Sequence, residues 1–212
     1  TGKLNKALEH CLRGAEAYRK GGYWNLHGWA LTTYFVVKSY LYQGDFANAL
    51  KYSQDLLRFG QDTNDSQMLV WGLYGRGLTQ DQKGDFGEAV INLRKAIELA
   101  EAVPDHRFRA MAGGDLGRCY LRQGDLGQAL AILEENDHYR AKYKMKRPFP
   151  SLRNGLVGAY LSAAEQSDQN ERGNWLGKAG RSCREALNQG KSYRIGLAEA
   201  MRLKGTYEWL RG

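Results

Sequence analysis

A nearly identical eight-residue segment occurs three times in this chain, forty residues apart each time. The copies are QGDFANAL at 43–50, KGDFGEAV at 83–90 and QGDLGQAL at 123–130, which also brings Ala49, Ala89 and Ala129 into register. Self-similarity at a fixed period of about 20 to 50 residues is typical of repeat proteins, whose units bury their apolar faces only against neighbouring units. The repeat therefore predicts a row of stacked units instead of one globule around a single core.

Each unit is predicted to be a pair of helices joined by a tight turn. Apolar residues recur at steps of three and four before Gly84, in 69–78, and after it, in 86–100. Gly84 can take the left-handed conformation that closes a helix, and Asp85 can cap the next helix. Small residues at positions 77, 117, 89 and 129 are expected where the two helices of a unit approach closely, because larger side chains would hold the backbones apart.

This order of small and apolar residues resembles the tetratricopeptide repeat (TPR) family. The resemblance is carried by Gly77, Gly84-Asp85-Phe86, Ala89, Leu93 and Ala96 in one unit, and by Gly117, Tyr120, Gly124-Asp125-Leu126, Ala129 and Leu133 in the next. The period of forty exceeds the family's usual 34 and is similar to long-helix variants appended to bacterial signalling ATPases, nucleotide cyclases and large transcription activators. The resemblance implies an all-α, right-handed superhelical solenoid of antiparallel helix hairpins with about ten helices.

The whole of 1–212 is interpreted as one TPR-like domain. Its predicted parts are the second helix of a preceding unit at 3–20, units near 25–60, 64–103, 105–146 and 150–190, and an unpaired first helix at 192–211. In the last unit a polar loop, EQSDQNERGN at 165–174, is expected to replace the Gly-Asp turn. Because solenoid ends normally carry polar capping helices, we expect the chain to be part of a longer protein, and its ends to be capable of self-association.

Motifs for catalysis, cofactors and metals are missing from the sequence. The four histidines are far apart, no glycine-rich phosphate loop or Gly-x-Ser-x-Gly elbow occurs, and no acidic pair stands out from a solvated helix surface. Three widely spaced cysteines argue against a disulfide framework and favour a reducing, cytoplasmic setting. No apolar run reaches the ~18 residues of a membrane span. We therefore expect a protein that is not an enzyme, without cofactor or metal.

The TPR resemblance implies a groove lined by positions 2, 5, 9, 12 and 13 of each first helix, counted from Ala30, Val70 and Ala110. The candidate groove residues are Tyr34, Lys38 and Tyr42, then Trp71, Tyr74 and Gln82, then Arg118 and Arg122, and Asn154 in the last unit. The same positions include Leu31, Leu41, Leu78, Asp81, Met111, Gly114, Leu121, Leu161 and Ser162. Aromatic rings beside cations form a plausible docking strip. Packing between units is the alternative for the larger apolar members, Trp71 and Leu41 above all.

The net charge of +8 is spread along the chain and favours acidic partners in general. The segment YRAKYKMKRPFP, 139–150, gathers cations and aromatics, but its cations alternate at every second residue and would scatter around a helix. A solvated helix end is therefore favoured over a nucleic-acid or anionic-membrane site at Tyr139 to Arg147. We expect a protein-binding or scaffolding module for a peptide or protein partner. The alternative is a regulatory arm of a bacterial signalling protein that senses a small-molecule ligand.

Overall fold

The computed structural model describes residues 2–21, 26–103, 106–146, 149–192 and 194–212. Ten α-helices and no strands lie in these ranges, which confirms the predicted all-α class and number of helices. The chain divides into two compact units, residues 1–109 (unit 1) and 110–212 (unit 2), and each is described by itself.

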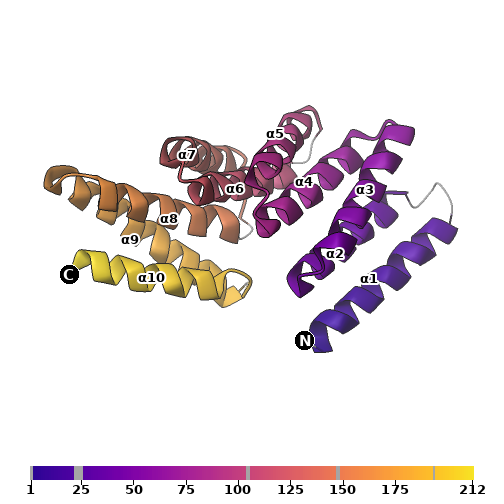
Figure 1. Cartoon of the computed structure of the whole chain (residues 1–212), viewed down its shortest axis with the longest axis horizontal. Coiled ribbons are helices and arrows are strands. Elements are labelled where there is room, and N and C mark those ends of the chain that lie inside the picture. Colours follow the sequence, from indigo (N-terminus) through magenta and orange to yellow (C-terminus); the bar gives the residue numbers. More distant parts are fainter. Residues whose placement is uncertain (1, 22–25, 104–105, 147–148, 193) are drawn as a thin grey trace. The chain divides into compact units, whose positions relative to one another are not determined.

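Unit 1 is built from antiparallel helices that contact their neighbours in chain order (Figure 1). Its helices are α1 (Gly2–Lys20), α2 (Leu26–Gln43), α3 (Phe46–Asp62), α4 (Ser66–Lys83), α5 (Phe86–Ala102) and the first turn of α6 (His106–Gln123). Helix α2 also contacts α4, so the first helices of successive repeats lie side by side.

Unit 2 continues the same pattern with the remainder of α6. It adds α7 (Leu126–Lys142), α8 (Pro150–Gln166), α9 (Gln169–Ser192) and α10 (Leu197–Arg211). Helix α8 contacts α7, α9 and α10, so it is the central element of this unit (Figure 1). Its apolar face joins the unit's core around Leu133, Leu152 and Leu156, all of them buried.

The three repeated turns have the conformation that their glycines predict. Gly44, Gly84 and Gly124 have φ angles of 76°, 90° and 80°, in the left-handed region. In each turn the N–H of the following aspartate donates to the carbonyl five residues earlier, at 2.9 to 3.0 Å. This arrangement satisfies carbonyl groups that a helix end would otherwise leave without donors.

The aspartates after these glycines do not all act alike. The Asp45 and Asp125 side chains accept the N–H three residues later, at 3.1 and 3.0 Å, as expected of N-caps. Asp85 makes no such bond, contrary to the sequence-based expectation. Its carboxylate instead pairs with the Lys83 ammonium at 2.8 Å. The other two turns have glutamine, not lysine, at this position.

Gly77 and Gly117 mark close contacts between the two helices of a unit, as predicted. A Cβ atom built on Gly77 would lie 2.8 Å from Leu93 Cγ, and one built on Gly117 would lie 2.6 Å from Leu133 Cδ2. On α8, a Cβ atom on Gly155 would also meet Leu133 Cδ2, at 2.8 Å. Leu133 of α7 is therefore enclosed between glycines of α6 and α8, which lets three helices pack at short range.

The polar segment at 165–174 is not a loop, so that prediction was wrong. Helix α8 continues to Gln166 and α9 begins at Gln169, which leaves only a short turn between them. Asp168 in this turn accepts the N–H groups of Asn170 and Glu171 at 2.9 and 3.0 Å. Asp168 thus caps α9 as the aspartates of two of the repeated turns cap their helices, but no glycine directly precedes it in the sequence. The polar residues that follow it form the exposed first turns of α9, a helix of 24 residues.

A polar network fixes α8 against its neighbours. Arg153, only 4% exposed, donates to both carboxylate oxygens of Asp137 on α7 at 2.7 and 3.2 Å, and pairs with Glu185 on α9 at 3.1 Å. On the same helix, Tyr160 donates its hydroxyl to Glu134 at 3.0 Å. Burial, together with the Glu134 charge, raises the pKa of Tyr160 above its usual range. These contacts hold the helix that supplies more lining residues than any other to the pocket described next.

Candidate functional site

Three of the predicted groove residues lie inside unit 1. Tyr34, Trp71 and Tyr74 are 2%, 2% and 1% exposed. Their rings surround Phe108 at the start of α6, with centroid separations of 5.0, 5.3 and 5.7 Å. Edge and tilted contacts of this kind are favourable packing geometries. In this structure the three rings contribute to the core, and a partner would find almost no exposed surface on them.

The other predicted residues of unit 1 are at the surface. Tyr42 is 45% exposed, and the Lys38 ammonium lies over its ring, 5.2 Å from the centroid. Phe35, one turn earlier on α2, is also exposed, while Gln82 is exposed near the end of α4. Helix α2 thus presents aromatic rings and a cation on one exposed side.

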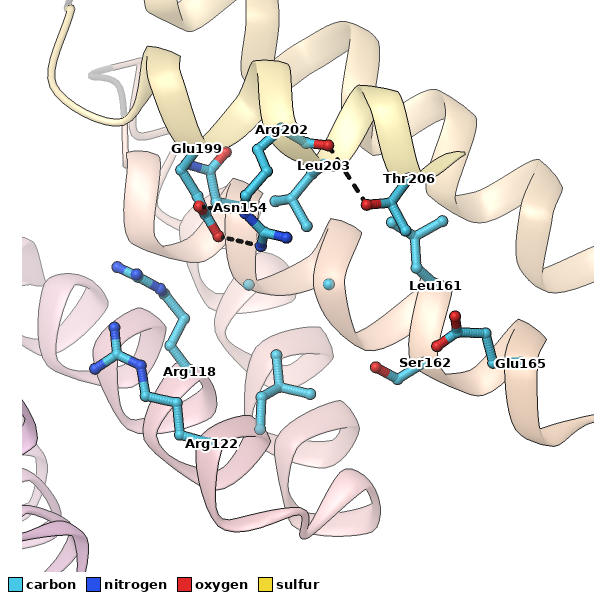
Figure 2. A pocket seen from close by; sticks show the side chains of 13 residues that line it. Arg118, Arg122, Asn154, Leu161, Ser162, Glu165, Glu199, Arg202, Leu203 and Thr206 are labelled. Atoms are coloured by element: carbon cyan, nitrogen blue, oxygen red, sulfur yellow. Dashed lines mark hydrogen bonds and ion pairs between the residues drawn. The ribbon is translucent and has the colours of Figure 1, made fainter. Parts of the chain in front are cut away.

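Unit 2 contains a pocket of about 410 Å³ between α6, α8 and α10 (Figure 2). We call it the unit-2 pocket; its lining residues are Arg118, Leu121, Arg122, Asn154, Gly155, Gly158, Leu161, Ser162, Glu165, Glu199, Arg202, Leu203 and Thr206. It brings together the last three candidate groove residues, Arg118, Arg122 and Asn154. All three contributing helices are first helices of their units in the sequence-based interpretation.

Arginines supply the charge of the unit-2 pocket. Arg118 and Arg122 project from α6, and Figure 2 shows both on the opposite side of the pocket from Arg202 of α10. Arg118 pairs with Asp115, one turn earlier, at 3.8 Å. Arg202 binds the Glu199 carboxylate with both nitrogens of its fork, at 3.0 and 2.8 Å. A partly exposed cluster of guanidinium groups is suited to hold carboxylates or other anions.

All three arginines lower the pKa of the Glu199 carboxyl group. The hydrogen bond from Arg202 lowers its pKa, and the charges of Arg202, Arg118 and Arg122 lower it further, against the opposing effect of partial burial. The same pair raises the pKa of Arg202. Glu199 is therefore ionised at neutral pH, and the pocket contains a fixed negative charge among its cations.

The floor of the unit-2 pocket consists of small and apolar residues. Gly155 and Gly158 leave space on α8, and Leu161 and Leu203 border it. Asn154, only 5% exposed, donates its amide to the Gly196 carbonyl at 2.9 Å. It thereby fixes the turn that precedes α10. The predicted groove residue thus lines the pocket and also positions the helix on its far side.

Sequence reasoning missed the four residues of α10 in this pocket. The groove positions were not carried over to the last helix, because that helix lacks a partner in the repeat scheme. Counting from Ala198, which places Gly205 at the small position, gives Glu199, Arg202 and Thr206 at positions 2, 5 and 9. The signal was therefore present in the sequence.

The basic segment near 139–150 ends a helix. Arg140 pairs with Asp137 at 3.1 Å and donates to the Met145 carbonyl, and the Tyr139 and Tyr143 rings pack against each other, 4.6 Å apart. Lys144 has a φ of 49° in the turn that follows. Arg147 and Pro148 lie outside the described residues. None of the described cations of this segment lines the unit-2 pocket.

Membrane spans and metal sites are absent from the described part of the chain. None of the helices there is long and apolar enough to span a membrane. Nor do the described residues hold three or more His, Cys, Asp or Glu side chains grouped to bind a metal ion. The cysteines are free, and two of them, Cys119 and Cys183, are buried. Exposed apolar side chains occur on α10, where Trp209 and Met201 are largely open to solvent.

Comparison with known proteins supports the repeat architecture. Residues 82–135 match the family model described as tetratricopeptide repeat. The structure is similar to BtubC (BKLC) from P. vanneervenii, with a TM-score of 0.68 and 13% identity over 98% of this chain and 91% of that one. It is also similar to a putative kinesin light chain of Podosopora anserina with nearly identical TPR-like repeats, with a TM-score of 0.59 and 18% identity over 91% and 90% of the two chains. A comparison with curated proteins gave no match. The structural likeness confirms an all-α, TPR-like helical-repeat solenoid as the fold class.

Proposed function

We propose that this chain, a tetratricopeptide-repeat protein, is a non-catalytic docking module that holds an acidic segment of a partner protein in the unit-2 pocket. Tetratricopeptide repeats generally mediate protein–protein interaction or scaffolding, and proteins built from them are typically not enzymes. The observation that carries the proposal is the presence of Arg118, Arg122 and Arg202 in one pocket, contributed by two helices. A cytoplasmic setting suits the three free cysteines.

The rest of the lining supports a peptide as the ligand. Asn154, Ser162 and Thr206 offer polar groups beside an apolar floor that includes Leu161 and Leu203. An extended or helical segment could place a carboxylate at the arginines and an apolar side chain on that floor. Because the helices already hold these groups in place, the ordering cost of binding falls mostly on the peptide.

A peptide-binding measurement tests this proposal. The test uses fluorescein-labelled peptides that carry an acidic residue beside an apolar one. Control peptides have Asn or Gln in place of the acidic residue. Each peptide would be titrated with the protein, and binding would be followed by fluorescence anisotropy. The acidic peptides should bind more tightly. Arg118→Ala combined with Arg122→Ala should weaken their binding by about tenfold, since each partly exposed contact with a carboxylate contributes ~0.7 kcal/mol.

A matched control separates the pocket from the overall charge of the protein. Arg181 and Arg184 are exposed on α9 and do not line the unit-2 pocket. Arg181→Ala combined with Arg184→Ala removes the same charge and should leave peptide affinity within about twofold of the unmodified protein. Equal losses for both double variants, or equal binding of the acidic and amide peptides, would contradict the proposal.

A small-molecule ligand is the second candidate, in line with a sensing arm. The volume of the unit-2 pocket, about 410 Å³, lies in the range of small-molecule sites, but its lining carries five charged side chains where such sites are mostly apolar. A thermal-shift screen of anionic metabolites tests this alternative. A compound that raises the unfolding temperature of the protein, but not that of Arg118→Ala plus Arg122→Ala, would favour sensing over peptide docking. Self-association through the terminal helices stays a prediction.

A further inference from the structure

The unit-2 pocket already contains a carboxylate of the chain itself. Glu199 lies in the first turn of α10, and the Arg202 fork holds both of its oxygens. Figure 2 shows this pair on the α10 side of the pocket, facing Arg118 and Arg122 on α6. A ligand carboxylate that entered the pocket would therefore meet Arg202 with its fork already engaged.

The charged side chains that line the unit-2 pocket add up to one positive charge. Arg118, Arg122 and Arg202 contribute three positive charges. Glu199, bound to Arg202, and Glu165 on α8 contribute two negative charges. The difference of one is enough to balance one carboxylate and too little to balance a phosphate ester, which carries about 1.5 to 2 negative charges at neutral pH.

The α8 end of the unit-2 pocket adds to this limit. Glu165 lines the pocket near the C-terminal end of α8, where helix carbonyl groups also make the potential negative. A second anionic group that extended away from the arginines along α8 would approach Glu165. The neutral residues between the two ends, Leu161 and Ser162, offer no cation to offset this repulsion.

We propose that Glu199 sets the charge that the unit-2 pocket accepts, so that the pocket binds a single carboxylate of a partner and disfavours a phosphorylated side chain. Glu199 acts as a specificity-determining residue by two routes: it supplies a fixed negative charge, and it engages the Arg202 guanidinium. This inference rests on the proposed function, because it specifies the ligand of the same pocket.

The test compares two small probes that differ mainly in charge. The probes are an aspartate and a phosphoserine, each with an acetylated amino end and a methylamide at the carboxyl end. Binding to the 212-residue chain would be followed by NMR at constant ionic strength, through the side-chain N–H resonances of Arg118, Arg122 and Arg202. The unmodified protein should bind capped aspartate at least as tightly as capped phosphoserine.

The informative variant is Glu199→Gln, which removes the charge but keeps the shape of the side chain. Capped aspartate should bind about twofold more tightly to this variant, and capped phosphoserine about fourfold, because the gain scales with the charge of the probe. Glu208→Gln provides the matched control: Glu208 is also on α10, pairs with Lys204 at 3.8 Å and does not line the pocket. It should leave the ratio of the two affinities unchanged.

Each outcome decides between the two proposals. If capped aspartate shifts the Arg118 and Arg122 resonances but Glu199→Gln leaves the affinity ratio unchanged, the charge-selection proposal is wrong and the docking function stands. If neither probe shifts those resonances in either protein, the docking function fails and the inference fails with it. Circular dichroism of Glu199→Gln checks that α10 remains folded. Should that variant unfold, Glu199→Ala with the same two probes gives the same comparison, since alanine has the highest helix propensity.

Discussion

Replacing Gly117 by alanine should destabilise unit 2, although alanine is the better helix former. In the middle of a helix, alanine is favoured over glycine by ~1 kcal/mol. At Gly117, however, the new Cβ atom would lie 2.6 Å from Leu133 Cδ2, where carbon atoms prefer about 3.5 to 4.0 Å. Leu133 or a whole helix would have to move by roughly 1 Å.

The surroundings of Leu133 prevent that movement. The side chain is fully buried, and Gly155 of α8 packs against its other side. A Cβ atom built on Gly155 would lie only 2.8 Å from Leu133 Cδ2. Overpacking of a core costs ~1–3 kcal/mol, so the favourable propensity is more than offset. We expect Gly117→Ala to lower the free energy of unfolding by ~1 kcal/mol. In contrast, Gly177→Ala on the exposed side of α9, where a Cβ atom meets nothing within 4 Å, should raise it by ~0.5–1 kcal/mol.

Urea denaturation followed by circular dichroism measures both effects, and both substitutions lie in the same unit. A double-mutant cycle identifies the cause: in a Leu133→Ala background, which itself should cost ~2–5 kcal/mol, Gly117→Ala should no longer destabilise. If Gly117→Ala stabilises the protein as much as Gly177→Ala does, the close contact between α6 and α7 is not what requires glycine, and the reasoning is refuted.

Three further substitutions test other parts of the fold by the same denaturation assay. Lys144→Gly should stabilise unit 2 by ~0.5–1 kcal/mol, because Lys144 has a φ of 49° that glycine adopts without strain; a loss of stability would contradict this. Asp125→Ala should cost ~1 kcal/mol through the lost N-cap, whereas Asp85→Ala, at a turn without a cap bond, should cost clearly less. Arg153→Met should cost ~1–2 kcal/mol, since it leaves the partly exposed Asp137 without its bidentate partner, and an unchanged midpoint would show that the network does not stabilise α8.

The hairpins could be predicted because their signals are local and repeated. A left-handed glycine followed by aspartate specifies the turn within a few residues, and Gly117 indicates a close contact without knowledge of the partner. The turn between α8 and α9 was missed for the same reason: Asp168 caps α9, but it follows Ser167 and has no glycine before it. A cap without the usual glycine gave no recognisable signal.

The burial of three candidate groove residues could not be predicted from the repeat. Counting along a helix indicates the direction in which Tyr34, Trp71 and Tyr74 point, but not what covers them. Phe108, from the start of the next first helix, fills the space between their rings. Such contacts depend on side chains from three helices at once. By contrast, Arg118 and Arg122 stay at the surface, as charged groups do unless they are paired in the interior.

The residues that hold unit 2 together are largely separate from those that give its pocket a charge. Leu133 and Gly117 are enclosed between helices, whereas Glu199 and Arg202 project from the α10 surface into the pocket and reach solvent. Gly155 is the exception, because a Cβ atom there would meet Leu133 on one side and Arg118 Cγ at 3.1 Å on the other. Substitutions of the charged residues should therefore change what the pocket binds at little cost in stability. A change at Gly155 would alter helix packing and the position of Arg118 together. Within the pocket, the charged residues can therefore be substituted more freely than Gly155, which is constrained by the fold.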